Sequence, residues 1–96
     1  MNIVDYIPFG KENAVKRSKL RALTKMDDRN MREAIEKAQM RGELILNMQD
    51  GAGYFRPILP EERDLVERWQ KIEKGRWIAS MNKYINAQSA LEATAE

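Results

Sequence analysis

A single helical segment takes up almost a third of this 96-residue chain. From Glu61 to about Ala90 the composition is helical, and acidic residues stand at the start, where the helix dipole favours them. Large apolar residues recur along it at Leu65, Trp69 and Ile72 and, beyond Gly75, at Ile78, Met81 and Ile85. A helix of about 30 residues is about 45 Å long, which exceeds what a domain of about 60 residues can cover. We therefore expect either a bend near Gly75 or a partner over the distal part, and a frayed tail from Ala87.

The best helix-start signal lies near the middle of the chain. Asp27 is a favourable N-cap, and Gly42 suits the left-handed position that ends many helices. Between them the apolar residues Met31, Ala34, Ile35 and Ala38 follow the i, i+3, i+4, i+7 spacing of an amphipathic helix. The pattern predicts a helix from about 28 to 41. A shorter helix is expected over 17–24, so a turn of three or four residues joins the two.

A β-hairpin is predicted to follow the second helix. The runs 43–46 and 54–56 are β-prone and flank 47–53, in which Asp50-Gly51 favours a turn. Pro57 and Pro60 bracket a connector to the long helix. At the other end of the chain, the mildly apolar residues 1–9 fit either a short helix or an extended arm closed by a turn.

The order helix, turn, helix, hairpin predicts the fold class. We expect a mainly α protein with a small β-hairpin: a winged helix-turn-helix domain over 1–57, followed by a C-terminal helix over 58–96 that serves packing or oligomerisation. In such a domain the first helix contacts the DNA backbone. The second lies in the major groove, with its N-terminal residues nearest the bases.

The residue types that are missing restrict the chemistry. The chain has no cysteine and no histidine, which removes disulfides, thiolate metal sites and imidazole acid–base catalysis. We expect no enzymatic activity, and we assign no catalytic residue, metal or cofactor. There is no run of about 18 apolar residues, and 1–10 lacks a basic segment followed by an apolar one. The sequence therefore predicts no membrane partner and a cytoplasmic location.

The positive charge is unevenly distributed. The formal net charge is +2, but between positions 11 and 25 six lysines and arginines face only Glu12, which gives that stretch a net charge of +5. We expect double-stranded DNA as the partner, with the outer face of the second predicted helix as its reader. The candidates for contacts with base edges are Arg29, Asn30 and Glu33. The candidates for phosphate contacts are Lys16, Arg17, Lys25 and Arg32. Further DNA-binding candidates are Lys37, which flanks the outer face, and Arg56, on the returning strand of the hairpin. The alternative is a solvated face of mixed charge with no ligand.

The long helix is the candidate interface. Trp69 and Trp77 are eight residues apart and lie close to one helix face, where they serve either core packing or an exposed interface. If Ile78, Met81 and Ile85 pair between chains, the protein is a homodimer. A second hypothesis is a protein-interaction module that binds a protein partner through the long helix and its tryptophans, since the net charge is low and the second helix carries glutamates.

Several short runs resemble a known class of proteins. These are 13–15, 20–29, Arg41-Gly42-Glu43-Leu44-Ile45 and Gly53-Tyr54-Phe55. Together they resemble winged helix-turn-helix proteins common in phages and prophages of Gram-positive bacteria, over about positions 3–57. Lys25 stands where those proteins usually have a turn glycine, so we expect it in a left-handed conformation. The resemblance implies a bacterial host cell and a role in transcription or replication, or, for the protein-interaction hypothesis, a phage accessory or host-inhibiting factor.

Overall fold

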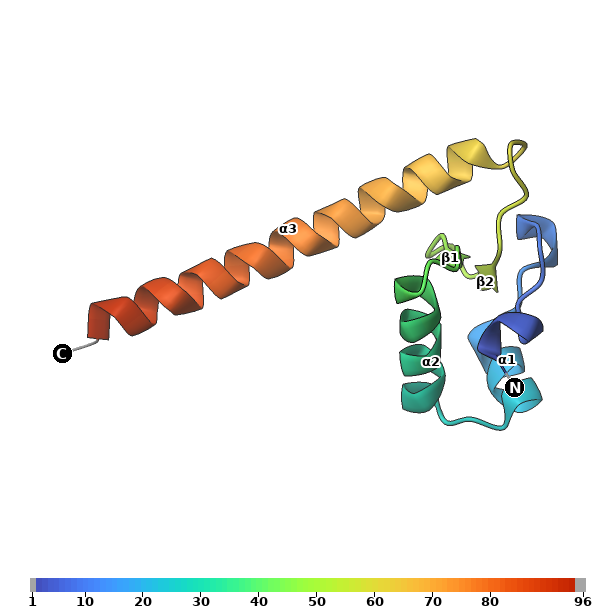
Figure 1. Cartoon of the computed structure of the whole chain (residues 1–96), viewed down its shortest axis with the longest axis horizontal. Helices are drawn as coiled ribbons and strands as arrows, with labels where there is room; N and C mark the ends of the chain where they lie inside the picture. The colour runs from blue at the N-terminus through green and yellow to red at the C-terminus, as the bar shows by residue number, and fades with distance from the viewer. Residues whose placement is uncertain (1, 95–96) are drawn as a thin grey trace.

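The protein, seen in a computed structural model that describes residues 2–94, contains three α-helices and a small two-stranded antiparallel sheet (Figure 1). The elements in chain order are the 3-10 turns η1 (Ile3–Tyr6) and η2 (Lys11–Asn13), helices α1 (Arg17–Thr24) and α2 (Asp28–Met40), strands β1 (Leu46–Asn47) and β2 (Tyr54–Phe55), and helix α3 (Arg63–Thr94). The first six elements gather together, whereas α3 extends beyond them, so the molecule measures 55 × 32 × 24 Å. The mainly helical class with a long C-terminal helix is confirmed.

Helix α1 has the predicted bounds and α2 ends one residue before its predicted end, because short-range hydrogen bonds fix the ends of both. Lys25 ends α1 in the left-handed conformation, with φ 59° and ψ 22°. The Asp27 side chain then accepts a hydrogen bond of 2.7 Å from the backbone N–H of Asn30, which caps α2. At the far end Gly42 has φ +104°, and the N–H groups of Gly42 and Glu43 donate to the carbonyls of Gln39 and Ala38. This pair of bonds is a Schellman motif.

The Asp27 cap supports a stability prediction. Asp27→Ala removes the acceptor for the Asn30 N–H and leaves one more amide of the first turn without a partner in the protein. We expect a loss of about 1 kcal/mol in the free energy of unfolding, which lowers the melting temperature by about 4–8 °C. Thermal denaturation followed by circular dichroism measures this shift. An unchanged melting temperature would show that the cap contributes nothing.

The strands are shorter than predicted, since the first was expected over 43–46 and the second over 54–56. Only Leu46↔Phe55 and Asn47↔Tyr54 pair, and the segment before Leu46 belongs to no strand. Helix α2 instead provides hydrogen-bond partners for the backbone of this segment. The Glu43 N–H donates to the last turn of α2, and the Gln39 side chain donates to the Ile45 carbonyl at 2.8 Å. On its other edge, β2 pairs with Val15, whose N–H and carbonyl both bond to Tyr54.

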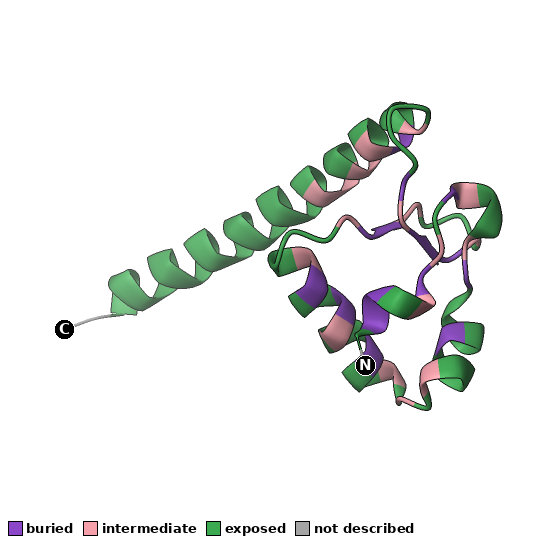
Figure 2. Ribbon diagram, turned by 45° about the vertical axis from the view of Figure 1, so that its right-hand side comes forward, coloured by how far each residue is buried: buried purple, intermediate pink, exposed green. Residues whose placement is uncertain are grey.

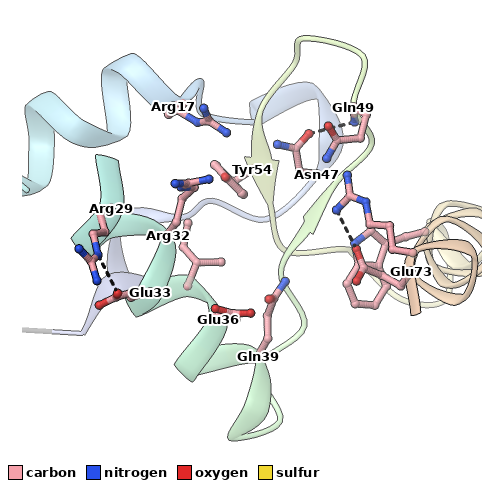
Figure 3. Close-up of a pocket in the computed structure, with 13 residues that line it drawn as sticks. Arg17, Arg29, Arg32, Glu33, Glu36, Gln39, Asn47, Gln49, Tyr54 and Glu73 are labelled. Atoms are coloured by element: carbon pink, nitrogen blue, oxygen red, sulfur yellow. Dashed lines mark hydrogen bonds and ion pairs between the residues drawn. The ribbon is translucent and has the colours of Figure 1, made fainter. Parts of the chain in front are cut away.

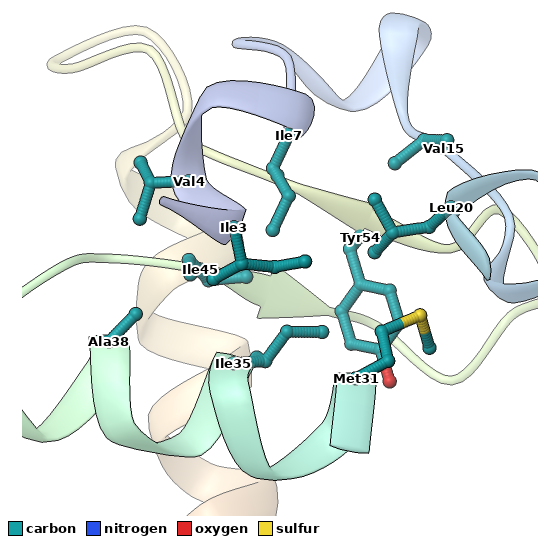
Figure 4. Packing of buried hydrophobic residues seen from close by; sticks show 10 residues of the cluster. All are labelled: Ile3, Val4, Ile7, Val15, Leu20, Met31, Ile35, Ala38, Ile45 and Tyr54. Atoms are coloured by element: carbon teal, nitrogen blue, oxygen red, sulfur yellow. The ribbon is translucent and has the colours of Figure 1, made fainter. Parts of the chain in front are cut away.

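The N-terminal segment takes the helical alternative and completes the core. Residues 3–6 form the single turn η1, and the Asn2 side chain caps it. Ile3, Val4 and Ile7 are buried and pack with side chains from α1, α2 and the hairpin (Figure 4). The larger cluster comprises Ile3, Val4, Ile7, Val15, Leu20, Met31, Ile35, Ala38, Ile45 and Tyr54. This shared core fixes the position of α2 relative to α1 and the sheet.

Helix α3 differs from the expectations at two points. The helix is continuous through Gly75, although a bend there was one of the two expected outcomes, and it runs to Thr94, although the tail from Ala87 was expected to fray. Leu65 is buried against Leu46 and Phe55, and Trp69 packs against the same cluster. From position 74 to 94 every residue is exposed (Figure 2). No helix among residues 2–94 combines the length and apolar character needed to cross a membrane.

Candidate nucleic-acid interface

The outer face of α2 is accessible along its whole length. Because Met31, Ile35 and Ala38 are buried, the residues on the opposite side point away from the core. The side chain of Arg29 is 84% exposed, that of Arg32 59% and that of Glu33 50%. The C-terminal half of the chain therefore does not cover the face that was expected to read DNA.

A cleft of about 640 Å³ separates this face of α2 from the hairpin and from α3 (Figure 3). Ile35 and Tyr54 contribute to its lining from the core side. Its charged lining consists of four arginines and three glutamates: Arg17, Arg29, Arg32, Arg76, Glu33, Glu36 and Glu73. The cleft is thus polar, with cations contributed by all three helices.

Ion pairs hold the arginines at the α1–α2 junction in place. Asp28 lies between two guanidinium groups, with Arg32 Nε at 3.2 Å and Arg17 Nε at 3.4 Å. Arg29 pairs with Glu33 one turn further along, at 3.3 Å. A guanidinium has five N–H donors, so each arginine keeps donors for a further ligand. Two arginines thus share the one carboxylate of Asp28 at this end of the cleft.

The predicted DNA-binding residues fall into three groups. Arg17, Arg29, Arg32 and Glu33 line the cleft together. Lys16 lies beside Arg17 in a neighbouring hollow between the start of α1 and the hairpin loop. Lys25 and Lys37 are exposed outside the cleft lining, and the Asn30 amide is directed at Asp27 Oδ2, at 3.3 Å.

Arg56 contacts the N-terminal segment. Its Nε donates to the Ile7 carbonyl at 2.7 Å, and its guanidinium lies 4.1 Å from the centre of the Phe9 ring. Both contacts hold the N-terminal segment against β2, and Arg56 does not line the cleft. These contacts engage Nε and one face of the guanidinium of Arg56.

The hairpin loop carries less negative charge than its own sequence indicates. Lys11, from η2, forms an ion pair with Asp50 at the loop. The hydrogen bond from Lys11, together with the N–H of Ala52, lowers the pKa of Asp50. Residues 47–53 contain Asp50 and no lysine or arginine, and the cation comes from a segment about forty residues earlier in the chain. Its local charge is therefore balanced.

Sequence reasoning missed the wall of the cleft that α3 provides. Trp69, Glu73 and Arg76 line it, and Arg76 pairs with Glu73 at 3.4 Å. No local pattern marks Arg76, because its place depends on the direction in which α3 leaves the hairpin. Of the two tryptophans, Trp69 packs on the core cluster, whereas Trp77 is 62% exposed, so core packing is wrong for Trp77.

Comparison of the chain with protein-family models, curated proteins and solved structures finds no match.

Proposed function

We propose that this chain binds double-stranded DNA as a winged helix-turn-helix protein, with α1 and α2 as the helix pair and the β1–β2 hairpin as the wing. One observation carries the proposal. Arg29 and Arg32, in the first half of α2, are exposed and lie beside Arg17 at the start of α1. Only three residues connect the two helices. In helix-turn-helix proteins this is where base edges and phosphates are contacted.

Each cation has a role in this proposal. Arg29 is far enough from the core to enter a major groove, where a guanidinium donates two hydrogen bonds to O6 and N7 of guanine. Lys16, Arg17, Lys25 and Arg32 contact phosphates on either side and set the register of the complex. The Lys11–Asp50 pair removes the repulsion that a free carboxylate on the hairpin loop would exert on a phosphate.

The proposal predicts a steep dependence of DNA affinity on salt. Four phosphate contacts correspond to a slope of about −3.6 in a plot of the logarithm of the association constant against that of the salt concentration. The affinity for a random duplex then falls about 100-fold between about 50 and 200 mM salt. Fluorescence anisotropy with a labelled duplex measures this slope. A duplex that is not retained even at the lowest salt concentration would refute DNA binding.

Binding of a protein partner is a second candidate function, favoured by one observation. Glu33, Glu36 and Glu73 line the same cleft as the arginines, and carboxylates repel phosphates. A cleft of alternating charge suits a polar peptide surface better than a uniformly anionic backbone. The two functions separate experimentally, because only DNA binding requires retention of a duplex at low salt. Only the second requires a protein whose co-purification is lost when the cleft residues Glu36 and Glu73 are replaced by alanine.

A further inference from the structure

The distal half of α3 carries a group of large apolar side chains that nothing in the described chain covers. The group consists of Trp77, Ile78, Met81, Tyr84, Ile85 and Leu91, all exposed. Tyr84 is 70% exposed and Leu91 66%. A soluble helix normally directs such residues at a core, and this part of α3 lies beyond the last contact with the sheet.

These side chains form one continuous stripe, which we call the distal stripe. Trp77, Tyr84 and Leu91 are seven residues apart, as are Ile78 and Ile85, and Met81 lies between the two rows. At 100° per residue all six lie within about 140° of the helix surface. The opposite side carries Ala79, Lys83, Asn86 and Ala90. The seven-residue repeat is that of helices that pack along one another.

The two halves of α3 are stabilised differently. Positions 63–76 hold eight charged residues, and the ion pairs of the described helix all lie there: Arg63–Glu67, Arg68–Asp64 and Arg76–Glu73. Between 77 and 91 Lys83 is the single charge, and two serines and two asparagines lower the helix propensity. Packing of an apolar face supplies most of the stability of helices in proteins. A surface that covers the apolar side chains of the distal half would therefore stabilise this part of α3.

We infer that this surface is the distal stripe of a second copy of the chain. When the exposed fractions are scaled by ordinary side-chain areas, the six residues offer about 600 Å² per chain. Complete burial of the stripe on both copies would remove about 1,200 Å² from water, the lower limit for a stable interface. The stripe holds no charge that would repel its own copy, since Lys83 lies on the opposite side. In a two-fold dimer the same patch is buried on both chains, so one apolar stripe provides both sides of the interface.

The test is the mass of the wild-type protein in solution as a function of concentration. Sedimentation velocity from about 1 to 200 µM, a range that brackets micromolar affinity, is expected to show conversion from 11.2 kDa to twice that mass. In a Trp69→Phe background Trp77 is the sole tryptophan, so its emission is expected to shift to the blue over the same range.

Paired glutamate substitutions locate the interface. Met81→Glu with Ile85→Glu places two charges in the distal stripe and is expected to raise the dissociation constant at least 100-fold. Ala79→Glu with Asn86→Glu adds the same charges to the opposite side of the same helix and is expected to leave the mass unchanged. Circular dichroism of both variants checks that the globular part remains folded.

Two results would overturn the dimer. One is a wild-type mass of a single chain at the highest concentration, and the other is an equal effect of the two glutamate pairs. Either result leaves the DNA proposal intact, because a monomer that retains a duplex at low salt still fulfils it. Conversely, a dimer that retains no duplex refutes DNA binding alone.

Discussion

Replacing Arg29 and Arg32 together with alanine is expected to weaken binding to duplex DNA about 100-fold at low salt. Arg29 is the residue best placed for a bidentate contact with guanine, which contributes about 1–3 kcal/mol. Arg32 adds a phosphate contact, so its loss also makes the salt dependence shallower by about one unit of slope. Fluorescence anisotropy with the wild type and the variant, each over a salt series, measures both effects.

Helix α3 offers a matched control for this variant. Arg63 and Arg68 are exposed and each pairs with a carboxylate four residues away, as Arg29 pairs with Glu33 and Arg32 with Asp28. Arg63→Ala with Arg68→Ala therefore removes the same charge and the same kind of ion pair from a surface that does not line the cleft. We expect this double variant to retain most of its affinity. Equal losses in the two variants would mean that net charge, and not the face of α2, governs binding.

Gly53→Ala is expected to destabilise the fold by about 3 kcal/mol or more. Gly53 has φ +101°, a conformation that costs a residue with a Cβ about 1 kcal/mol or more. The space is also closed: an added Cβ would overlap the Val15 carbonyl oxygen, lie 2.6 Å from its carbon and lie 2.8 Å from the Cα of Lys16. These are backbone atoms, so the Val15–Tyr54 pairing must open to admit the methyl group.

Gly51 separates the conformational cost from the clash. Its φ is +86°, close to that of Gly53, but an added Cβ would meet nothing within 4 Å. Gly51→Ala is therefore expected to cost only about 1 kcal/mol. Urea denaturation of the wild type and both variants gives the two free energies of unfolding. If Gly51→Ala and Gly53→Ala lower the free energy of unfolding equally, the close approach of the hairpin to Val15 does not contribute to the destabilisation.

The Gly53 variant also connects the hairpin with the proposed binding surface. Val15 is followed directly by Lys16 and Arg17, so the pairing with Tyr54 sets where α1 begins. Ile7 and Phe9 are held on the other side by Arg56. The hairpin thus positions the cations of α1 through the backbone, whether or not its loop contacts a ligand.

The sequence alone determined the parts of the fold that depend on neighbours in the chain. The ends of α1 and α2 follow from Lys25, Asp27 and Gly42, whose hydrogen bonds reach only three to five residues. The burial of Met31, Ile35 and Ala38 follows from their spacing, because the period of a helix fixes which residues share a face. For the same reason the exposure of Arg29 and Arg32 was predictable.

Only the tertiary structure decided what depends on segments distant in sequence. The strands are short because α2 takes the hydrogen bonds of Glu43 and Ile45. The negative charge of the hairpin loop is balanced because Lys11 reaches Asp50. Arg76 became part of the cleft because α3 leaves the sheet beside α2. Local propensity carries no information on such contacts, since they arise when separate elements bury a common core. The distal stripe of α3 depends on both kinds of information. The spacing of its apolar residues is visible in the sequence, whereas their exposure follows from where the core ends.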